Sequence, residues 1–361
     1  MALRDYASHH HHHRIEPRDP KSHSHLFTGL SNIITRCRTN KFESSSFEKV
    51  ALLPSSTPSS LSDKYGSCTD ILHYGSQSSV RVYAKSFPSA SCRNQAVHVI
   101  KVFRRSSNPA VLNRQLFEQS LASTVSHPNI LRALDVLHNN QREPCLVTEY
   151  CAGGDLKTLI STYGTLDALE ADCFFKQIMR AVSYLHDNAV AHRDIKTENI
   201  LLTAHGAVKL TDFGSAQWLS EETGKDIEQT GFPLETTASS PPRKLAGTLP
   251  YLPPEELSEP VSDPRPGDIW AAGLVYMAMR CGYLLWRMPC TVEDTGFKAY
   301  LRGRQSCHGY RPIEDLNKTS CQNVIYAMLC PIHSRRIVAS DVLRSEWVYG
   351  IHVCDPGDMG W

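Results

Sequence analysis

The sequence predicts an α+β fold, in which a strand-rich first part is followed by a helix-rich second part. Segments 71–83 and 97–103 have the apolar and β-branched pattern of strands. From residue 174 to 186, apolar residues instead recur every three or four positions, which is the period of a core helix. With 361 residues, the chain has room for one large domain of two lobes or for two domains.

The expected elements follow one another along the chain. The hairpin-like segment 71–83 and the strand 97–103 come first, and Asn108-Pro109 then provides a helix start, because asparagine caps a helix and proline suits its first turn. That helix ends before His127-Pro128-Asn129-Ile130. A strand over 146–150 runs into a glycine-containing linker, and helical patterning dominates the sequence from there.

Composition and charge argue against several classes of protein. The formal net charge is +1, so the chain lacks the basic footprint of a nucleic-acid-binding protein. Its 12 cysteines include no Cys-x-x-Cys pair and no signal peptide is evident, so we expect a reduced, cytoplasmic location, with peripheral membrane association as an addition. The apolar segment 269–286 carries Arg280 and two glycines, which favours a buried helix over a membrane span.

Residues 1–62 are predicted to form a disordered tail rich in serine and histidine. Apolar residues are sparse there and show no period. A run of five histidines, His9 to His13, either binds metal or is an expression tag. Because no cysteine or carboxylate stands beside the run, we interpret it as solvated tail and leave it out of the fold prediction.

Segment 190–214 concentrates the residues suited to chemistry. It offers two carboxylates, an amide and a lysine, which are Asp194, Asp212, Asn199 and Lys196. Two short apolar runs look like strands around a turn at His205-Gly206, so a hairpin would bring Asn199 close to Asp212. Oxygen ligands of this kind suit Mg²⁺, which is held by few protein groups together with substrate phosphates. Asp194 would then stand beside the metal, free to orient a hydroxyl.

His192-Arg193-Asp194-x-Lys196-x-x-Asn199 and Asp212-Phe213-Gly214 resemble the catalytic loop and the metal loop of the eukaryotic protein kinases. An ordinary hairpin with capping residues is the alternative, but four distinct residues at the family's spacing favour the resemblance. It covers roughly residues 63–350 and implies a two-lobed fold, with a β-rich lobe over about 63–150 and a helical lobe over about 151–350. Residues 351–361 would form a C-terminal tail.

The resemblance implies transfer of a phosphoryl group from ATP to a protein serine or threonine. Asp194 would orient the accepting hydroxyl, and Lys196 would steady the γ-phosphate. Asn199 and Asp212 would hold Mg²⁺. Lysine two positions after the catalytic aspartate is the mark of the serine/threonine kinases, and tyrosine kinases usually differ there.

Lys101 and Glu118 are expected to form an ion pair that positions the other phosphates. For either residue alone, a solvated surface position is the alternative. Glu118 stands ten residues before Pro128, which is the family's usual spacing for this glutamate.

The remaining nucleotide contacts that the resemblance implies are Gly75, Val80, Glu149, Cys151, Asp155 and Leu201. Glu149 and Cys151 would offer backbone groups to the adenine, and Asp155 could reach the ribose. In the loop over the phosphates, His73 and Ser78 replace the first and third glycines of the family's pattern. Glycine permits the closest approach of backbone N–H groups to phosphate, so these two replacements could reduce the affinity for ATP.

A long irregular segment after Asp212 ends at residues 247–255, which resemble the end of a kinase activation segment. Thr248 would lie near the catalytic aspartate and Lys196. We expect Glu255 to pair with Arg336, and Asp268 to bond to the backbone of the catalytic loop.

Arg193 creates a question about activation. Kinases with this arginine often place a phosphate where this chain has Lys244, and a lysine would instead repel Arg193. We therefore expect activation either through Ser239 and Ser240, with an upstream kinase acting on segment 215–246, or through an acidic side chain.

Downstream residues, including Leu285-Trp286-Arg287 and Phe297-Lys298-Ala299-Tyr300-Leu301, are similar to those of the fungal kinases that regulate plasma-membrane transporters (the halotolerance and nitrogen-permease-reactivator group). The implied function is that of a protein serine/threonine kinase. A pseudokinase acting as a nucleotide-binding scaffold is the alternative, and only the altered phosphate loop favours it. Segment 247–255 argues against a small-molecule phosphotransferase, because in kinases it builds the platform for a peptide.

Overall fold

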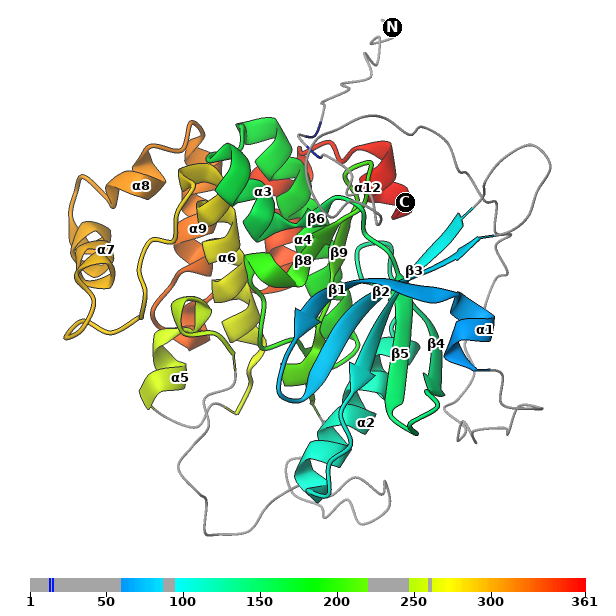
Figure 1. Cartoon of the computed structure of the whole chain (residues 1–361). Helices are drawn as coiled ribbons and strands as arrows, with labels where there is room; N and C mark the ends of the chain where they lie inside the picture. Colours follow the sequence, from blue (N-terminus) through cyan, green and yellow to red (C-terminus); the bar gives the residue numbers. More distant parts are fainter. Residues whose placement is uncertain (1–12, 14, 16–59, 87–94, 220–246, 259–261) are drawn as a thin grey trace, which may run out of the picture.

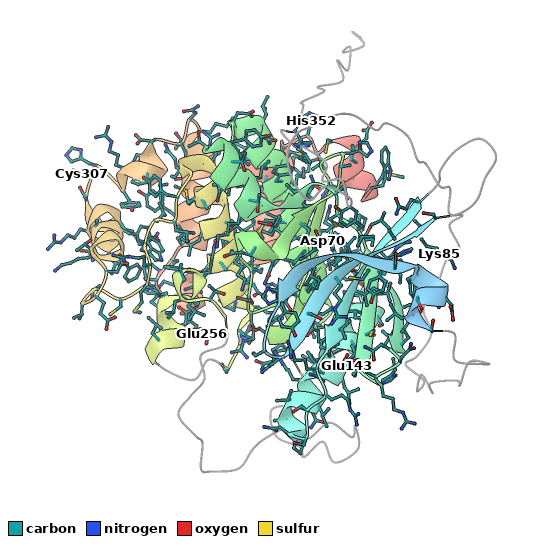
Figure 2. The ribbon with its side chains drawn as sticks, in the orientation of Figure 1. Asp70, Lys85, Glu143, Glu256, Cys307 and His352 are labelled. Atoms are coloured by element: carbon teal, nitrogen blue, oxygen red, sulfur yellow. The ribbon has the colours of Figure 1, made fainter. Side chains whose placement is uncertain are left out.

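The computed structural model describes residues 13, 15, 60–86, 95–219, 247–258 and 262–361. A β-rich lobe and a larger helical lobe lie next to each other, and the chain passes from the first to the second after residue 149 (Figure 1). This confirms the predicted two-lobed α+β fold. The side chains labelled in Figure 2 mark the two lobes: Lys85 of β2 and Glu143, just before β5, belong to the β-rich lobe, and Glu256 and Cys307 belong to the helical lobe.

The first lobe is built on an antiparallel sheet with the strand order β1-β2-β3-β5-β4. Its strands are β1 (Ser67–Tyr74), β2 (Ser78–Ser86), β3 (Gln95–Phe103), β4 (Ala133–His138) and β5 (Pro144–Glu149). Helix α1 (Leu61–Tyr65) packs on the sheet, where Leu61 and Tyr65 join a buried apolar cluster with Ile100 and Val147. Helix α2 (Pro109–Thr124) begins as predicted, because the Asn108 side chain accepts a hydrogen bond from the backbone N–H of Ala110.

Short strands connect the helical lobe to the site. They are β6 (Gly154–Asp155), β7 (Val190–Ala191), β8 (Ile200–Leu202), β9 (Val208–Leu210) and β10 (Gln217–Trp218). Single 3₁₀ turns occur at η1 (Thr197–Asn199), η2 (Phe213–Ser215), η3 (Leu249–Tyr251) and η4 (His333–Arg335). Strands β8 and β9 pair as the predicted hairpin, with Ile200 opposite Leu210.

The second lobe packs around two buried helices. The helices are α3 (Leu156–Tyr163), α4 (Ala168–Asp187), α5 (Pro254–Ser258), α6 (Arg265–Cys281), α7 (Thr295–Gln305), α8 (Arg311–Glu314), α9 (Thr319–Met328), α10 (Ala339–Arg344), α11 (Glu346–Tyr349) and α12 (Asp355–Met359). Helices α4 and α6 contact each other and carry many of the fully buried side chains. The apolar segment that begins at Ile269 is therefore core helix, and within the described residues no helix is long and apolar enough to cross a membrane.

Both ends of the chain differ from the predicted boundaries. Helix α12 and the residues around it belong to the folded lobe, because the Asn129 side chain donates to the carbonyl of Gly357 (3.0 Å) and the Thr203 hydroxyl donates to that of Trp361 (3.2 Å). At the other end, His13 and Ile15 lie against the helical lobe instead of in solvent. The rest of segment 1–59 lies outside the described residues.

Candidate active site

The open end of the β8–β9 hairpin brings the predicted metal ligands together. Asn199 stands immediately before β8 and Asp212 two residues after β9. The N–H of Thr211 donates to the carbonyl of Asn199 (3.0 Å), which closes this end of the hairpin. The sequence reasoning that placed Asn199 beside Asp212 therefore agrees with the backbone.

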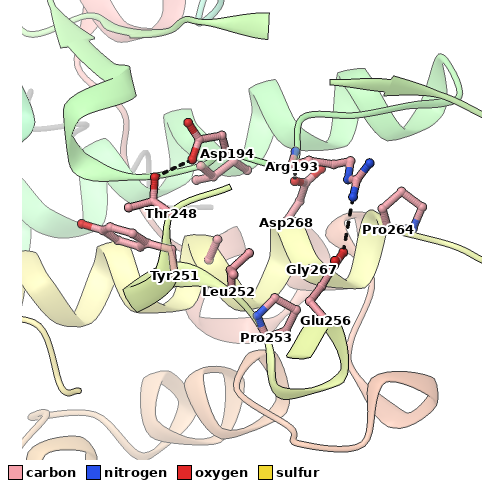
Figure 3. Close-up of a pocket in the computed structure, with 12 residues that line it drawn as sticks. Arg193, Asp194, Thr248, Tyr251, Leu252, Pro253, Glu256, Pro264, Gly267 and Asp268 are labelled. Carbon is pink, nitrogen blue, oxygen red and sulfur yellow. Dashed lines mark hydrogen bonds and ion pairs between the residues drawn. The ribbon is translucent and has the colours of Figure 1, made fainter. Parts of the chain in front are cut away.

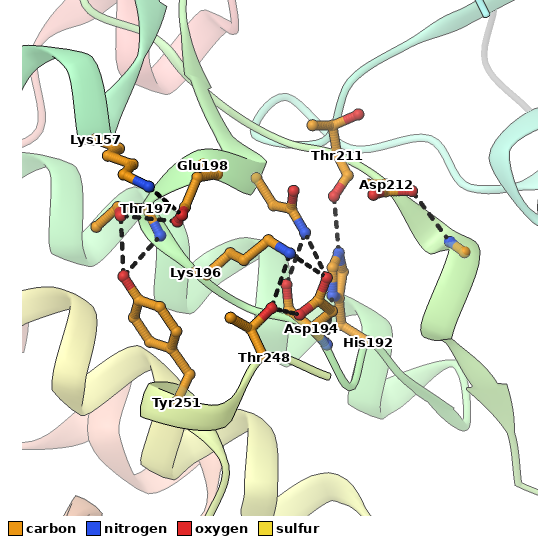
Figure 4. A network of polar contacts seen from close by, with 12 residues as sticks. Lys157, His192, Asp194, Lys196, Thr197, Glu198, Thr211, Asp212, Thr248 and Tyr251 are labelled. Carbon is orange, nitrogen blue, oxygen red and sulfur yellow. Dashed lines mark hydrogen bonds and ion pairs between the residues drawn. The ribbon is translucent and has the colours of Figure 1, made fainter. Parts of the chain in front are cut away.

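Asp194 is held by three side chains in one polar cluster (Figure 4). Its Oδ2 lies 2.7 Å from the Lys196 ammonium, and its Oδ1 accepts from the Thr248 hydroxyl at 2.8 Å. Lys196 also donates to the Thr248 hydroxyl (2.9 Å), so the three residues form a closed ring of contacts. The Asn199 amide donates to the Asp194 carboxylate (3.1 Å) and carbonyl (2.8 Å), which leaves Oδ1 of Asn199 as the group suited to a cation.

Lys101 joins the two lobes. Its ammonium lies 2.5 Å from Glu118 of α2 and 3.0 Å from Asp212 of the helical lobe. Burial alone would lower the pKa of Lys101, but these two carboxylates outweigh it and raise the pKa, so the ammonium stays charged. Burial raises the pKa of Glu118, which Lys101 opposes. For Asp212, the effect of burial is outweighed by Lys101, and the pKa is lowered.

The backbone at Asp212 is in the left-handed region, with φ of +69°. This conformation lets the Asp212 carboxylate accept from the N–H of Gly214 (3.4 Å) and directs Phe213 inward, where it is buried and contacts the His192 ring. The His192 ring is also within hydrogen-bond distance of the Thr211 carbonyl (3.0 Å). The catalytic loop and the metal loop are thereby fixed to each other.

Two acids, the buried Asp268 and the partly buried Glu255, support the site without facing it. Asp268 of α6 accepts hydrogen bonds from the backbone N–H groups of His192 and Arg193, both at 2.8 Å, as expected. Glu255 pairs with Arg336 through two contacts, at 2.6 and 2.9 Å, which confirms the expected pair. Hydrogen bonds to a charged carboxylate are stronger than those between neutral groups. Asp268 therefore holds the catalytic loop, and the bidentate pair of Glu255 and Arg336 holds the end of the activation segment.

The chain matches the protein kinase domain model over residues 78–348. It belongs to the protein kinase family. Serine/threonine-protein kinase hal4 of Schizosaccharomyces pombe is 39% identical over 310 residues, which are 85% of this chain and 47% of that protein. Serine/threonine-protein kinase HAL4/SAT4 of Saccharomyces cerevisiae is 40% identical over 300 residues, which are 82% of this chain and 48% of that protein.

Serine/threonine-protein kinase HAL5 of Candida glabrata is 32% identical over 244 residues, covering 63% of this chain and 28% of that protein. The predicted membership of this fungal kinase group is confirmed by these relatives. The chain spans about half the length of the first two relatives.

Arg193 of this kinase domain has two partners that the sequence reasoning missed. Its guanidinium donates to Gln217 (2.9 Å) and lies 3.9 Å from Glu256 of α5. The charge of Arg193 was expected to be balanced by a phosphorylated serine or by an acidic side chain. Among the described residues, Glu256 is such an acidic side chain. Lys244, Ser239 and Ser240 lie outside the described residues. The available signal was a second acid directly after Glu255, but its direction depends on how α5 packs.

A pocket next to Asp194 is lined by the end of the activation segment and by α6 (Figure 3). Tyr251 and Leu252 lie on the activation-segment side, and Gly267 lies on α6. The Tyr251 hydroxyl is 2.9 Å from that of Thr197, so this wall is tied to the catalytic loop (Figure 4).

The predicted phosphate-loop positions lie at the turn between β1 and β2. The N–H of Gly75 donates to the carbonyl of Ser78 (2.9 Å), and a Cβ at Gly75 would come within 2.8 Å of the His73 ring. A side chain at position 75 would therefore displace the exposed His73 ring. Val80 stands opposite Lys101 in the sheet, so the loop's register is fixed relative to the lysine.

The hinge residues have other contacts in this structure. The Glu149 side chain pairs with Lys209 (3.0 Å) and accepts from the N–H of Arg132 (2.9 Å). Burial raises the pKa of the Cys151 thiol, which keeps it neutral. Asp155 caps α3, accepting from the N–H and the hydroxyl of Thr158, both at 2.8 Å. Leu201 stands opposite Lys209 in the β8–β9 hairpin.

Proposed function

We propose that this chain transfers the γ-phosphoryl group of Mg-ATP to serine and threonine hydroxyls of proteins. The observation that carries the proposal is the line of charged groups from Glu118 through Lys101 to Asp212, beside the ring of Asp194, Lys196 and Thr248. Phosphoryl transfer needs positioning and charge stabilisation more than covalent chemistry, and these groups supply both.

Each group has a distinct task in the proposed reaction. Asp194, oriented by Thr248, accepts a hydrogen bond from the attacking hydroxyl and takes its proton as the bond to phosphorus forms. Lys196 places its positive charge beside the transferred group. Lys101 holds the α- and β-phosphates, and Glu118 keeps its ammonium in place. Oδ1 of Asn199 and the carboxylate of Asp212 are hard oxygen donors that suit Mg²⁺, which would neutralise phosphate charge when bound.

The nucleotide contacts of the proposal come from both lobes. Gly75, Val80 and Leu201 would surround the phosphates and base, and the backbone of Glu149 and Cys151 would meet the adenine. The tie between Asp155 and Thr158 competes with a contact to the ribose, so Asp155 contributes first to the start of α3.

Arg193 suggests how the domain is kept active. We propose that Glu256 balances its charge and reduces the need for a phosphate on the activation segment. We also propose an upstream kinase that phosphorylates segment 215–246. This part holds only if the Glu256→Gln variant becomes active solely when that segment is phosphorylated. If Glu256→Gln has no effect on activity, the role of Glu256 is refuted.

The cellular role is proposed from the fungal relatives. Regulation of membrane transporters, from a cytoplasmic and peripherally membrane-associated position, would fit the resemblance noted above. Ion uptake in fungal cells carrying either the intact chain or Asp194→Asn would test it, and equal uptake would contradict it.

The activity itself is tested with labelled ATP and Mg²⁺, using the chain and a generic serine/threonine substrate mixture. Incorporation that disappears in Asp194→Asn is expected. ATP binding without incorporation would instead favour a pseudokinase scaffold. If the chain neither binds ATP nor incorporates phosphate, the kinase proposal is refuted, and His73 and Ser78 become the first residues to examine.

A further inference from the structure

Three residues from distant parts of the chain meet behind the active site, and we call them the rear cluster: His13, Cys173 and Cys354. Nε2 of His13 lies 3.2 Å from Sγ of Cys354 and 4.0 Å from Sγ of Cys173, and the two sulfur atoms are 3.6 Å apart. Cys173 belongs to α4, and Cys354 stands immediately before α12. Neither the catalytic loop nor the proposed nucleotide site uses these residues.

The His13 ring occupies a space that the fold leaves for it. The ring stacks on Phe174 with centroids 4.6 Å apart and planes 16° apart, and its side chain is 6% exposed. On the other side, a Cβ at Gly206 would lie 2.1 Å from the ring, and Gly206 has φ of +94°. Glycine at the turn of the β8–β9 hairpin therefore serves both the turn and the ring.

A second layer of polar groups surrounds the rear cluster. Oε1 of Glu170, a buried residue of α4, lies 3.6 Å from Nδ1 of His13 and turns Nε2 toward the sulfur atoms. The Gln177 amide donates to Sγ of Cys173 (3.4 Å). Oε1 of Gln177 in turn accepts from the N–H of Val208 (2.7 Å) and the side chain of Asn129 (3.0 Å), which fixes the amide orientation.

We propose that the rear cluster binds a zinc ion through Nε2 of His13 and the two sulfur atoms. Tetrahedral zinc with bonds of about 2.3 Å to sulfur and about 2.0 Å to nitrogen places two sulfurs about 3.8 Å apart and sulfur and nitrogen about 3.5 Å apart. The observed separations of 3.6, 3.2 and 4.0 Å lie within a few tenths of an ångström of this geometry. A water molecule or another protein group would complete the tetrahedron.

The second layer matches what zinc sites require. A carboxylate on the far nitrogen of a histidine ligand fixes the tautomer and strengthens the ligand, and Glu170 occupies that position. A donor to a thiolate stabilises its negative charge, and Gln177 supplies one to Cys173. The ligands are the soft and borderline donors that favour zinc over magnesium or calcium.

Zinc binding at the rear cluster is coupled to protons. Zinc binds the unprotonated forms of imidazole and thiol groups, so Nε2 of His13 and the two sulfur atoms must be free of protons in the zinc-bound chain. We therefore expect zinc affinity to fall as the pH is lowered.

The consequence is a cross-link between three parts of the chain. Zinc would tie residue 13 to α4 and to the start of α12, next to the turn of the β8–β9 hairpin. A Cys173–Cys354 disulfide is the competing use of the same sulfur atoms, which lie 3.6 Å apart. It would form by exchange with an external small-molecule disulfide, which takes up the two electrons and two protons of the thiols. A disulfide would remove both thiolates and abolish the zinc site.

Cobalt is the spectroscopic probe for the test, with the full chain kept reduced. We expect one Co²⁺ per chain, the strong visible bands of a tetrahedral ion and a thiolate-to-cobalt charge-transfer band. Cys173→Ser and Cys354→Ser each remove this band, whereas Cys321→Ser, at a buried cysteine elsewhere, retains it. Zinc displaces the cobalt and raises the melting temperature of the intact chain.

Several results would overturn the proposal. Cobalt bound without a charge-transfer band would assign the metal to the histidine run alone, because imidazoles cannot produce that band. An intact band in Cys354→Ser would move the site elsewhere, and a Cys173–Cys354 disulfide that persists under reducing conditions would replace it. The spectrum of the intact chain decides the question even if a variant does not fold.

Discussion

The two ends of the β8–β9 hairpin carry two different kinds of site. At the open end, Asn199 and Asp212 flank the strands and face the active site. At the turn, Gly206 makes room for His13 of the rear cluster. The first site was evident from the sequence and the second was not, although the same hairpin supports both.

Exposure separates the two sites in the way their chemistry requires. The Asp212 side chain is 41% exposed, as expected of a group that meets a metal and a substrate that come and go. The His13 side chain is 6% exposed and that of Glu170 is 1% exposed, as expected of residues around the zinc ion proposed to stay bound in the rear cluster. The comparison teaches that one rigid hairpin can serve turnover at one end and cross-linking at the other.

The strongest way to separate the ends is Asp194→Asn. Asparagine keeps the shape but cannot accept the hydroxyl proton, so we expect phosphoryl transfer to fall by about 10²–10⁴-fold. The rear cluster lies at the other end of the hairpin, so cobalt binding should be unchanged. Incorporation rates and cobalt spectra of the same preparation check both statements, and parallel losses would show that the ends are coupled.

Most of the active site could be predicted because its chemistry is local in sequence. Asp194, Lys196 and Asn199 lie within one loop, and Asp212 is joined to them by a short hairpin. Close spacing fixes geometry, so the pattern alone indicates which groups meet. The pair of Lys101 and Glu118 is less local, yet a strand and the next helix still determine it.

The rest depends on how the whole chain packs. Residues 13, 173 and 354 share no periodicity, and only the closed fold brings them together. The histidine run was interpreted as solvated because the cysteines and the carboxylate that meet it are more than 150 residues away. Glu256 was missed for the same reason, since its direction toward Arg193 is set by α5.

Glu118→Gln sharpens the comparison within the active site. Glutamine removes the charge that holds Lys101, so the phosphates lose their alignment and we expect activity to fall by about 10²-fold. The effect should include a higher KM for ATP, and cobalt binding should again be unaffected. Glu143→Gln, at a partly buried carboxylate of the same lobe that pairs with Asn139 instead of Lys101, is the matched control. Equal activity in the two variants would refute the role of the pair.

Glu170→Gln makes the reverse test at the turn end. An amide is a weaker partner for Nδ1 of His13, so we expect cobalt affinity to fall by about 10–100-fold. The rate of phosphoryl transfer should stay within about twofold of that of the intact chain. Competition with a metal chelator measures the affinity, and Glu314→Gln serves as the control. An unchanged affinity would exclude Glu170 from the second layer.

His127 supplies the smallest effect and extends the rear cluster toward α2. Its Nδ1 accepts from the N–H of Asn129 (3.0 Å), and the Asn129 side chain reaches Gln177, which donates to Cys173. Burial, together with Arg180 and Lys209, lowers the pKa of His127 to about 4. The ring is therefore neutral in the folded chain and must give up this arrangement to take a proton.

The direction of the pH effect follows from linkage. In the unfolded chain the pKa of His127 is near the ordinary histidine value of 6.5, and in the folded chain it is about 4, so this residue destabilises the fold as the pH falls through that interval. In His127→Asn, the side-chain oxygen replaces Nδ1 as acceptor and does not titrate. Unfolding of the variant should take up about one proton fewer between these pH values, so its melting temperature should fall less than that of the intact chain. Thermal melts across that range measure it, with His308→Asn at an exposed position as the control. An equally steep fall in both variants would show that His127 does not contribute to the loss of stability at low pH.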